Sequence, residues 1–327
     1  MNMTLAQSIG DVGKGGLGKL LRYFNLLHQI RKEVKRIKPS LVYITPNSAG
    51  VPFYKDFVIV QLVKSLGCRV MVHFHNKGVV TRQDKLVDNF LYKRFFRNTK
   101  IILLAKSLYR DIEKYVDERD VYFCSNGIPE SLTHHRITDA RRLNILFLSN
   151  MMRAKGVLTL LLACAKLKSR RLPFHCIFAG AWKDISEADF AIKVNELHLD
   201  EDVEAVGPQY GEDKEKYLNL ADVFVLPSYN ECLPLTIIES MQHGVACIST
   251  NVGAIPSVID EGETGFVIAP GDSDALADKL QWLIEHPEAC KAMGKCGYEK
   301  YRRNYTLEQF ENNFSKILRE ETSCYTG

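Results

Sequence analysis

The chain has 327 residues, of which 46% are hydrophobic and 25% are charged, and its formal net charge is +4 at pH 7. This length allows two domains with sizeable cores, and the composition is that of an ordinary soluble globular protein. No apolar run approaches the roughly 18 residues that a transmembrane helix needs, and the polar stretch after Met3 does not resemble a secretory signal.

The nine cysteines are scattered along the chain without a C-x-x-C pair or another metal-ligand spacing. Most lie inside apolar segments, as Cys68, Cys164, Cys176 and Cys247 do. We therefore expect reduced thiols in the core, which favours a cytoplasmic protein.

The charge is unevenly distributed along the chain. Residues 1–138 carry 23 Lys and Arg against 11 Asp and Glu, a net charge of +12, whereas residues 139–327 carry 20 against 28, a net charge of −8. A basic half predicts an anionic partner, and nucleic acid, phosphorylated ligands and an anionic membrane all meet that condition. The alternative is an ordinary solvated surface.

In the first half, short β-branched or aromatic runs alternate with helical patterns. Strands are predicted at residues 41–45, 69–74, 100–105 and 121–124, and the clearest helix at residues 17–37. That helix has an apolar stripe from Leu17 to Ile37 and a basic opposite face, which predicts packing on the core. The alternative is a helix at a membrane interface.

The stretch before this helix, GDVGKGGLGK at residues 10–19, contains the letters of two phosphate-binding loops. From Gly13 it spells G-x-G-x-x-G, but no strand precedes it. It also spells G-x-x-x-x-G-K, but Leu20 stands where a P-loop needs Ser or Thr. We therefore predict only a turn that leads into the helix.

A polar stretch at residues 129–142 marks the predicted domain boundary. A second alternation follows, with strands at 144–149, 174–179, 223–227 and 245–250 and helices near 156–170, 185–198 and 234–243. An amphipathic helix is predicted at 306–321. Two consecutive β-α-β series predict an α/β protein of two parallel sheets, with the ligand in the cleft between the domains.

The most informative segment is residues 221–260, where a buried strand leads through the turn PSYN into a helix that begins near Pro234. Glu231 lies in the loop, and Glu239 lies on the helix eight residues later. Each carboxylate can accept hydrogen bonds from vicinal hydroxyls, and the helix N-terminus with Thr236 offers a phosphate site. The segment thus offers, in order, a site for hydroxyls, a site for phosphate and a second site for hydroxyls. A sugar nucleotide has its groups in the same order, with a diphosphate between the sugar and the ribose.

With these two glutamates as an E-x7-E motif, the chain resembles family 4 of the glycosyltransferases, which are retaining enzymes of the GT-B fold. The similarity extends over residues 244–272, 148–167, 178–182 and 124–130. It implies two Rossmann-like, doubly wound domains that face a cleft. The expected parts are an acceptor-side domain at 1–137, a nucleotide-sugar-binding domain at 138–305, and a helix at 306–327 that crosses back to the first domain.

The resemblance also implies roles for single residues. Glu231 would hold hydroxyls of the donor sugar, Glu239 the ribose and Lys155 the diphosphate. His75, at the carboxyl end of a strand, would be catalytic together with Glu231, whereas His73 is expected in the core. The full set of expected donor-binding residues is Asn150, Arg153, Lys155, Gly180, Asn230, Glu231, Cys232, Leu235, Thr236 and Glu239.

Two positions depart from the family pattern. Asn150 stands where an Arg is common, and Arg153 is close enough in sequence to replace it. Cys232 stands where a Gly usually follows the first Glu. The backbone N–H that would contact a phosphate is kept there, in a tighter pocket.

We expect no metal ion and no cofactor. Two D-x-D pairs occur, Asp200/Asp202 and Asp272/Asp274, but neither follows the buried strand that precedes such a metal site.

A first domain of this family should begin with a buried strand and a glycine loop against the donor phosphates. The stretch MNMTLAQSI is short and polar-interrupted, whereas the later segments match in order. We therefore expect an incomplete N-terminal domain that lacks about 40–60 residues, or one or two β-α units.

The predicted function is transfer of a sugar from a nucleotide-diphosphate sugar to a glycan or lipid-linked hydroxyl acceptor, with retention, in the synthesis of a surface polysaccharide or glycolipid. The basic first half predicts peripheral contact with the anionic inner face of a membrane, and no nucleic acid is expected. The alternatives are a pseudoenzyme that binds nucleotide sugars or a partner protein, and a nucleotide-sugar epimerase. An NAD-dependent oxidoreductase is disfavoured, because Lys35, Arg36 and Lys38 stand where an acidic residue is required.

Overall fold

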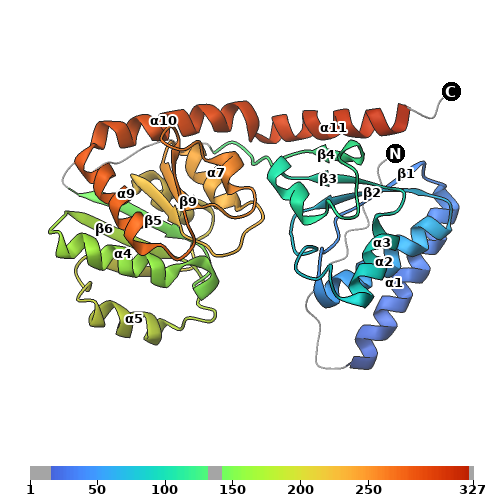
Figure 1. The fold of residues 1–327 in the computed structure, drawn as a ribbon, viewed down its shortest axis with the longest axis horizontal. Helices are drawn as coiled ribbons and strands as arrows, with labels where there is room; N and C mark the ends of the chain where they lie inside the picture. The colour runs from blue at the N-terminus through green and yellow to red at the C-terminus, as the bar shows by residue number, and fades with distance from the viewer. Residues whose placement is uncertain (1–15, 132–141, 324–327) are drawn as a thin grey trace.

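The computed structural model describes residues 16–131 and 142–323. Within these ranges the chain forms two α/β domains that lie side by side (Figure 1). Most of the glycine-rich stretch at 10–19 and most of the boundary stretch at 129–142 lie outside the described residues. The prediction of an α/β protein with two parallel sheets is confirmed.

The N-terminal sheet has four parallel strands in the order β1-β2-β3-β4. They are β1 (Leu41–Ile44), β2 (Arg69–Phe74), β3 (Thr99–Leu103) and β4 (Val121–Phe123), which confirms the four predicted strands. The helices are α1 (Gly16–Ile37), α2 (Gly50–Ser65) and α3 (Leu86–Phe96). Buried side chains of α2, α3 and β2, including Phe53, Phe95 and Phe74, belong to one core cluster.

The C-terminal sheet has six parallel strands in the order β10-β9-β8-β5-β6-β7. This is the order of a doubly wound sheet, in which the winding reverses between β5 and β8. The strands are β5 (Leu143–Leu148), β6 (Phe174–Ala179), β7 (Val203–Gly207), β8 (Val223–Leu226), β9 (Ala246–Thr250) and β10 (Gly265–Ile268). The sequence predicts four of them, and β7 and β10 are found only in the structure.

The helices of this domain lie between its strands and after them. They are α4 (Val157–Ser169), α5 (Glu187–Glu196), α6 (Gly211–Leu220), α7 (Leu235–Gln242), α8 (Ile255–Val258), α9 (Ser273–Glu285) and α10 (Pro287–Asn304). The helices predicted near 156–170, 185–198 and 234–243 are thereby confirmed.

The last helix, α11 (Leu307–Ser323), leaves the C-terminal domain and covers the second face of the N-terminal sheet (Figure 1). Ile317 is buried there with Met71 and Ile102 of the sheet. At the end of α11, Tyr122 Oη donates to Glu321 Oε1 over 2.7 Å. The C-terminal helix therefore holds the two domains together along one side of the molecule.

The prediction that α1 packs on the core holds for only part of its apolar stripe, since Ile30 packs against the core cluster and the first turns are exposed. Leu20, Leu21 and Phe24 keep 52%, 60% and 58% of their exposure, and none of residues 18–37 is buried. Its neighbour is α2, where Tyr23 Oη donates to the carbonyl of Lys55 over 2.7 Å. The periodicity identifies the apolar face of the helix correctly, but no described element covers its first turns. None of the described helices is long and apolar enough to cross a bilayer.

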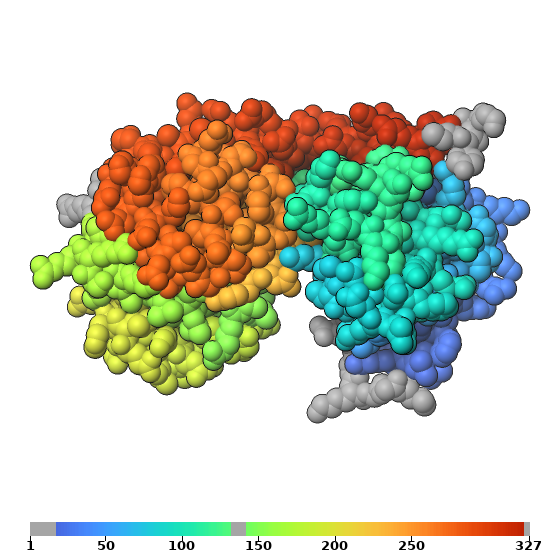
Figure 2. Space-filling model, viewed as in Figure 1, coloured from blue at the N-terminus to red at the C-terminus, as the bar shows by residue number. Residues whose placement is uncertain are grey.

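Two segments link the domains and pair with each other. Ile128 N donates to the carbonyl of Tyr305 over 3.0 Å, and Leu307 N donates to the carbonyl of Ile128 over 2.9 Å. On the side away from α10 and α11, the domains are separated by a recess (Figure 2). The site described below lies where the domains face each other.

Candidate active site

The first carboxylate of the E-x7-E motif lies where the winding of the C-terminal sheet reverses. Glu231 follows β8, and Lys155 ends the short helix η3 (Arg153–Lys155), which follows β5. Lys155 Nζ lies 2.6 Å from Glu231 Oε1, and Ser228 Oγ donates to the same oxygen over 2.9 Å. Because doubly wound sheets bind ligands in the crevice at this point, the pair lies where a donor is expected.

The second carboxylate also has a lysine partner. Glu239 lies on α7, and its Oε1 accepts a hydrogen bond from Lys214 Nζ of α6 over 2.9 Å. The exposed fractions of these two side chains are 28% for Lys214 and 19% for Glu239. Each motif glutamate is therefore held by a partly shielded ammonium from another element.

The loop that carries Glu231 packs closely against the backbone at Gly253. At this glycine φ is +60°, and an added Cβ would lie 2.2 Å from the carbonyl oxygen of Glu231. Ala254 N donates to the carbonyl of Cys232 over 2.7 Å. From the other domain, Ser107 of η1 (Lys106–Asp111) donates its hydroxyl to the carbonyl of Gly253 over 3.1 Å. The motif loop is therefore rigid and touches a segment that contacts the N-terminal domain.

The expected donor-binding residues Asn150, Arg153 and Gly180 lie on the loops after β5 and β6. A side chain at Gly180 would lie 1.8 Å from the carbonyl oxygen of Ser149, so the close approach of these loops requires glycine. Asn150 and Arg153 are exposed. The charge of Arg153 acts on Asp189 of α5, and its backbone N–H donates to Asp184 Oδ1 over 2.9 Å. Contact of Arg153 with a diphosphate stays a prediction.

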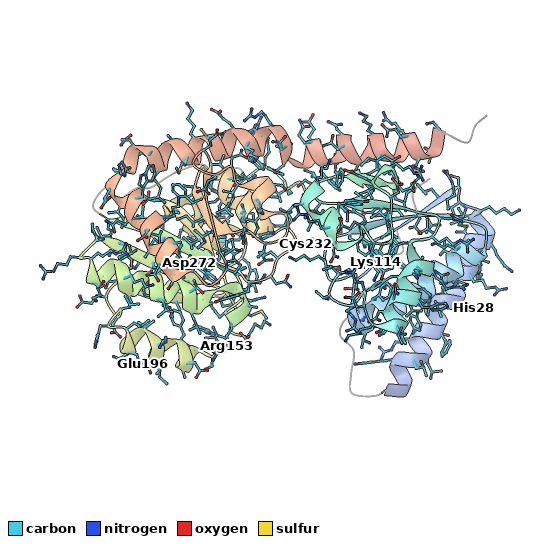
Figure 3. The ribbon with its side chains drawn as sticks, viewed as in Figure 1. His28, Lys114, Arg153, Glu196, Cys232 and Asp272 are labelled. Atoms are coloured by element: carbon cyan, nitrogen blue, oxygen red, sulfur yellow. The ribbon has the colours of Figure 1, made fainter. Side chains whose placement is uncertain are left out.

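The remaining expected residues surround the start of α7. Asn230 is exposed, Leu235 keeps 44% of its exposure, and Thr236 is half-buried in the first turn. Pro234 is the N-cap residue of this helix, one position before the predicted first turn. Cys232 lies on the side of the C-terminal domain that faces the N-terminal domain (Figure 3).

On the N-terminal side, His75 lies directly beyond β2, next to the buried His73. The ring centroids of these two histidines are 4.2 Å apart. Tyr43 Oη lies 2.9 Å from His73 Nδ1, and burial with the nearby charge of His75 lowers the pKa of His73 to about 3. The prediction that His73 is a core residue is confirmed. Burial also lowers the pKa of His75, against a hydrogen bond with Asn126 that raises it.

The loop after His75 is fixed by Asp111. Its carboxylate accepts the backbone N–H groups of Gly78, Val79 and Val80, over 2.9, 3.1 and 3.1 Å. Lys77 lies in this loop, and its charge lowers the pKa of the Cys232 thiol, which burial raises to about 12. A charge of the N-terminal domain therefore acts on the residue that follows Glu231.

The two D-x-D pairs have structural contacts. Asp202 Oδ2 pairs with Lys168 Nζ over 2.7 Å, and Asp272 Oδ1 accepts the N–H of Ala275 at the start of α9 over 2.8 Å. Among the described residues, no group of three or more His, Cys, Asp or Glu side chains is placed to hold a metal ion.

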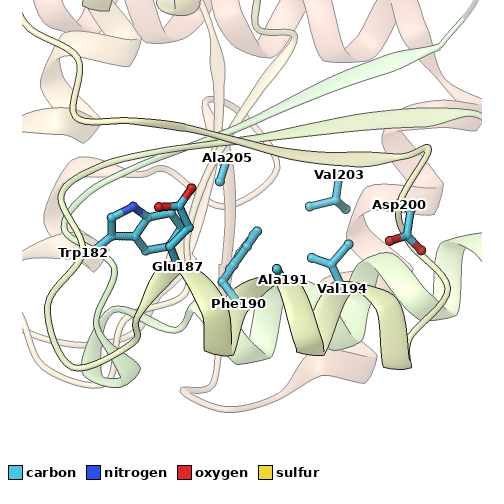
Figure 4. A pocket seen from close by; sticks show the side chains of 8 residues that line it. All are labelled: Trp182, Glu187, Phe190, Ala191, Val194, Asp200, Val203 and Ala205. Carbon is cyan, nitrogen blue, oxygen red and sulfur yellow. The ribbon is translucent and has the colours of Figure 1, made fainter.

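A shallow groove of about 260 Å³ lies along α5 at the edge of the C-terminal sheet. Figure 4 shows Phe190 and Val194 of α5 opposite Val203 of β7, with carboxylates at Glu187 and Asp200. None of the expected donor-binding residues lines this groove. It reflects the packing of α5 beside an edge strand and is separate from the two glutamate–lysine pairs.

The sequence that forms the doubly wound sheet matches a known family. The family model of glycosyl transferases group 1 matches residues 135–300, about half of the chain. The chain belongs to the glycosyl transferases of group 1. The matched range contains both motif glutamates and Lys155.

Two curated relatives are similar over longer stretches. N-acetyl-alpha-D-glucosaminyl L-malate synthase of Bacillus anthracis is 27% identical over 214 residues, which are 64% of this chain and 54% of the relative. The amylovoran biosynthesis glycosyltransferase AmsK of Erwinia amylovora is 26% identical over 233 residues, 68% of this chain and 57% of the relative. The chain thus spans about half the length of the curated relatives it matches.

The solved structure of Anabaena Alr3699/HepE in complex with UDP and glucose has the same fold. Its TM-score is 0.73 at 15% sequence identity, and the match covers 93% of this chain and 83% of that chain. Together with the two parallel-sheet domains, this similarity confirms the predicted GT-B fold.

Sequence reasoning missed two side chains that contact the motif glutamates. Ser228 stands in the quoted turn PSYN, where nothing distinguishes its hydroxyl from that of an ordinary turn residue. Lys214 stands in the run GEDKEKY, which is typical of a solvated helix. The Ser228 contact lies within one loop, three residues from Glu231, whereas the Lys214 contact depends on the placement of another helix.

Proposed function

We propose that this glycosyltransferase-family chain moves a sugar from a nucleotide-diphosphate sugar to a hydroxyl acceptor, with retention and without a metal ion. The Lys155–Glu231 pair carries this proposal, because it sets a cation beside an acceptor of hydroxyl protons in the crevice at the switch point. The HepE structure, which contains UDP and glucose, supports a nucleotide-sugar donor. The relationship to AmsK supports a role in polysaccharide or glycoconjugate synthesis.

In the proposed reaction, the acceptor hydroxyl attacks the anomeric carbon on the face from which the diphosphate leaves. The bond between the sugar and the diphosphate breaks, the glycosidic bond forms on the same face, and the departing phosphate oxygen takes the proton of the acceptor. Glu231 holds hydroxyls of the donor sugar, and Lys155 stabilises the charge that develops on the diphosphate. His75 polarises the donor sugar through a hydrogen bond from its neutral ring.

The test is transfer or hydrolysis of radiolabelled UDP-, GDP- and ADP-sugars by the purified full chain, in the presence of membrane lipid extracts. Glu231→Gln keeps the shape of the side chain and removes the charge, so we expect the rate to fall by about 100-fold or more. Glu263→Gln, at an exposed position of the same domain, is the control and should keep the rate.

Two outcomes would change the proposal. Unchanged turnover by a folded Glu231→Gln variant would contradict the site. Donor binding without any release of sugar would favour the alternative of a pseudoenzyme that binds nucleotide sugars.

We also propose that the N-terminal domain contacts an anionic membrane that carries the acceptor. The support is the outer face of α3, where Leu86, Val87 and Phe90 keep 88%, 67% and 60% of their exposure. Lys93 and Arg94 follow at exposed positions of the same helix. An apolar first turn followed by cations suits insertion below anionic headgroups, with the long side chains reaching the phosphates.

Co-sedimentation with vesicles tests this contact. The full chain should bind vesicles that contain anionic phosphatidylglycerol more strongly than neutral phosphatidylcholine vesicles, and Leu86→Ser with Phe90→Ser should weaken binding about tenfold or more. Ile192→Ser is the control, because Ile192 keeps 59% of its exposure on the C-terminal domain. Equal binding to both vesicle types, or no effect of the double substitution, would contradict a membrane contact at α3.

A further inference from the structure

Glu239, which the family resemblance expects to bind the ribose, has a cationic partner that no motif identifies. Lys214 Nζ lies 2.9 Å from Glu239 Oε1, between residues 25 positions apart on two helices. We infer that Lys214 is a donor-binding residue that recognises the ribose together with Glu239. This inference rests on the proposed function, together with the expectation from the family resemblance that Glu239 binds the ribose.

The placement of Lys214 on α6 distinguishes it from an ordinary surface lysine. Leu218 is buried, and Lys214 lies on the same side of the helix at a spacing of four residues. Lys216 of the same helix is exposed. The side chain of Lys214 keeps only 28% of its exposure, so the ammonium is directed toward α7 rather than into solvent.

The chemistry of the pair matches a vicinal diol. A ribose hydroxyl both donates and accepts, whereas a carboxylate only accepts and an ammonium only donates. One N–H of Lys214 is used on Glu239 Oε1, which leaves two N–H groups of the ammonium and the other carboxylate oxygen. One ribose hydroxyl can therefore donate to Glu239 while its oxygen, or that of its neighbour, accepts from Lys214.

The same geometry predicts selectivity against a deoxyribose. When a hydroxyl is removed from the ligand, the ammonium and the carboxylate keep each other as partners, but the hydrogen bonds to the sugar are lost. Lys214 should therefore contribute to the affinity for ribonucleotides and contribute little to the affinity for deoxyribonucleotides.

The test measures binding of UDP, GDP and ADP, and of the 2′-deoxy and 3′-deoxy forms of the best ligand, by titration calorimetry on the full chain. In the unchanged protein we expect at least one deoxy form to bind about tenfold more weakly. Lys214→Met should weaken ribonucleotide binding about tenfold and change binding of that deoxy form less than about twofold. The ratio of the affinities for the ribonucleotide and the deoxy form should therefore fall toward one. Lys214→Arg should restore most of the ratio, and Lys216→Met is the matched control.

The possible results separate the inference from the function it rests on. If the ratio of the two affinities is unchanged in a folded Lys214→Met variant, the inference is wrong, while the donor site stands. An equal weakening of both forms would then show that Lys214 has a structural role. If the unchanged protein binds no nucleoside diphosphate, the proposed function fails and the inference fails with it.

Discussion

The two domains are built from the same β-α unit but differ in how far the apolar faces of their helices are buried. In the C-terminal domain, α4 buries seven of its 13 residues. In the N-terminal domain, none of residues 18–37 of α1 is buried, and α3 exposes Leu86, Val87 and Phe90. The charges differ as well, at −8 for residues 139–327 and +12 for residues 1–138. The C-terminal domain therefore has partly shielded pairs of charged side chains, whereas the N-terminal domain exposes an apolar and basic surface.

The conformation of the loop that carries Glu231 depends on Gly253. Because φ is +60° and an added Cβ would lie 2.2 Å from the carbonyl of Glu231, Gly253→Ala should lower the free energy of unfolding by about 3 kcal/mol. Gly207→Ala is the control, since φ is +71° there and nothing lies within 4 Å. It should cost about 1 kcal/mol. Urea denaturation measures both, and equal losses would show that the Gly253 loop yields to a side chain.

The acid stability of the N-terminal domain depends on His73. The unfolded chain takes up a proton at this residue near pH 6.5 and the folded chain only near pH 3, so stability falls as the pH falls through this window. The slope for one proton is about 1.4 kcal/mol per pH unit, which amounts to about 2 kcal/mol between pH 6.5 and 5. His73→Phe should reduce the slope by one proton in denaturation curves from pH 4 to 7. A slope that stays the same would show that the folded protein protonates His73 readily.

The attachment of α11 to the N-terminal sheet depends on Glu321. Its carboxylate accepts from Tyr122 and pairs with Lys100 Nζ at 3.6 Å and Arg69 at 3.7 Å. Glu321→Gln should cost about 1 kcal/mol and speed hydrogen exchange in α11, because the charged acceptor of Tyr122 is lost and Arg69 loses an ion-pair partner, whereas Lys100 keeps Asp120 at 2.8 Å. Glu320→Gln, at an exposed position beside it, should change neither quantity.

An equally small effect is expected at Asp272, in the second D-x-D pair. Asp272 caps α9, so Asp272→Ala should cost about 1 kcal/mol in thermal or urea denaturation. If transfer is metal-independent as proposed, this variant and treatment with EDTA should both leave the rate of sugar transfer unchanged. A loss of transfer that Mg²⁺ or Mn²⁺ restores would instead place a cation in the mechanism.

The strands with a strong β-branched or aromatic run could be predicted to within a residue or two. β6 begins and ends at the predicted residues, 174 and 179. β7 has the sequence VEAVG with Glu204 and Ala205 exposed, and β10 is four residues long inside a glycine-containing stretch. Such short or edge strands lack a pattern of their own, because pairing with a neighbour defines them.

For the site, the sequence could predict Glu231, Glu239 and Lys155, because the residue spacing within a strand–loop–helix unit reports local geometry. It could not predict the partners of the two carboxylates. Lys155 and Glu231 are 76 residues apart, and Lys214 and Glu239 are 25 apart, so both contacts depend on how the β-α units stack.

By itself, the sequence determined the α/β class, the order of most elements, the family resemblance and the uneven charge, because these follow from local periodicity and composition. The tertiary structure alone decided which apolar faces are covered and which charges are paired. A helical stripe shows which side of α1 or α3 is apolar, but burial requires another element against that side. Likewise, a lysine in a charged run becomes a partner of Glu239 only when α6 and α7 pack within hydrogen-bonding distance.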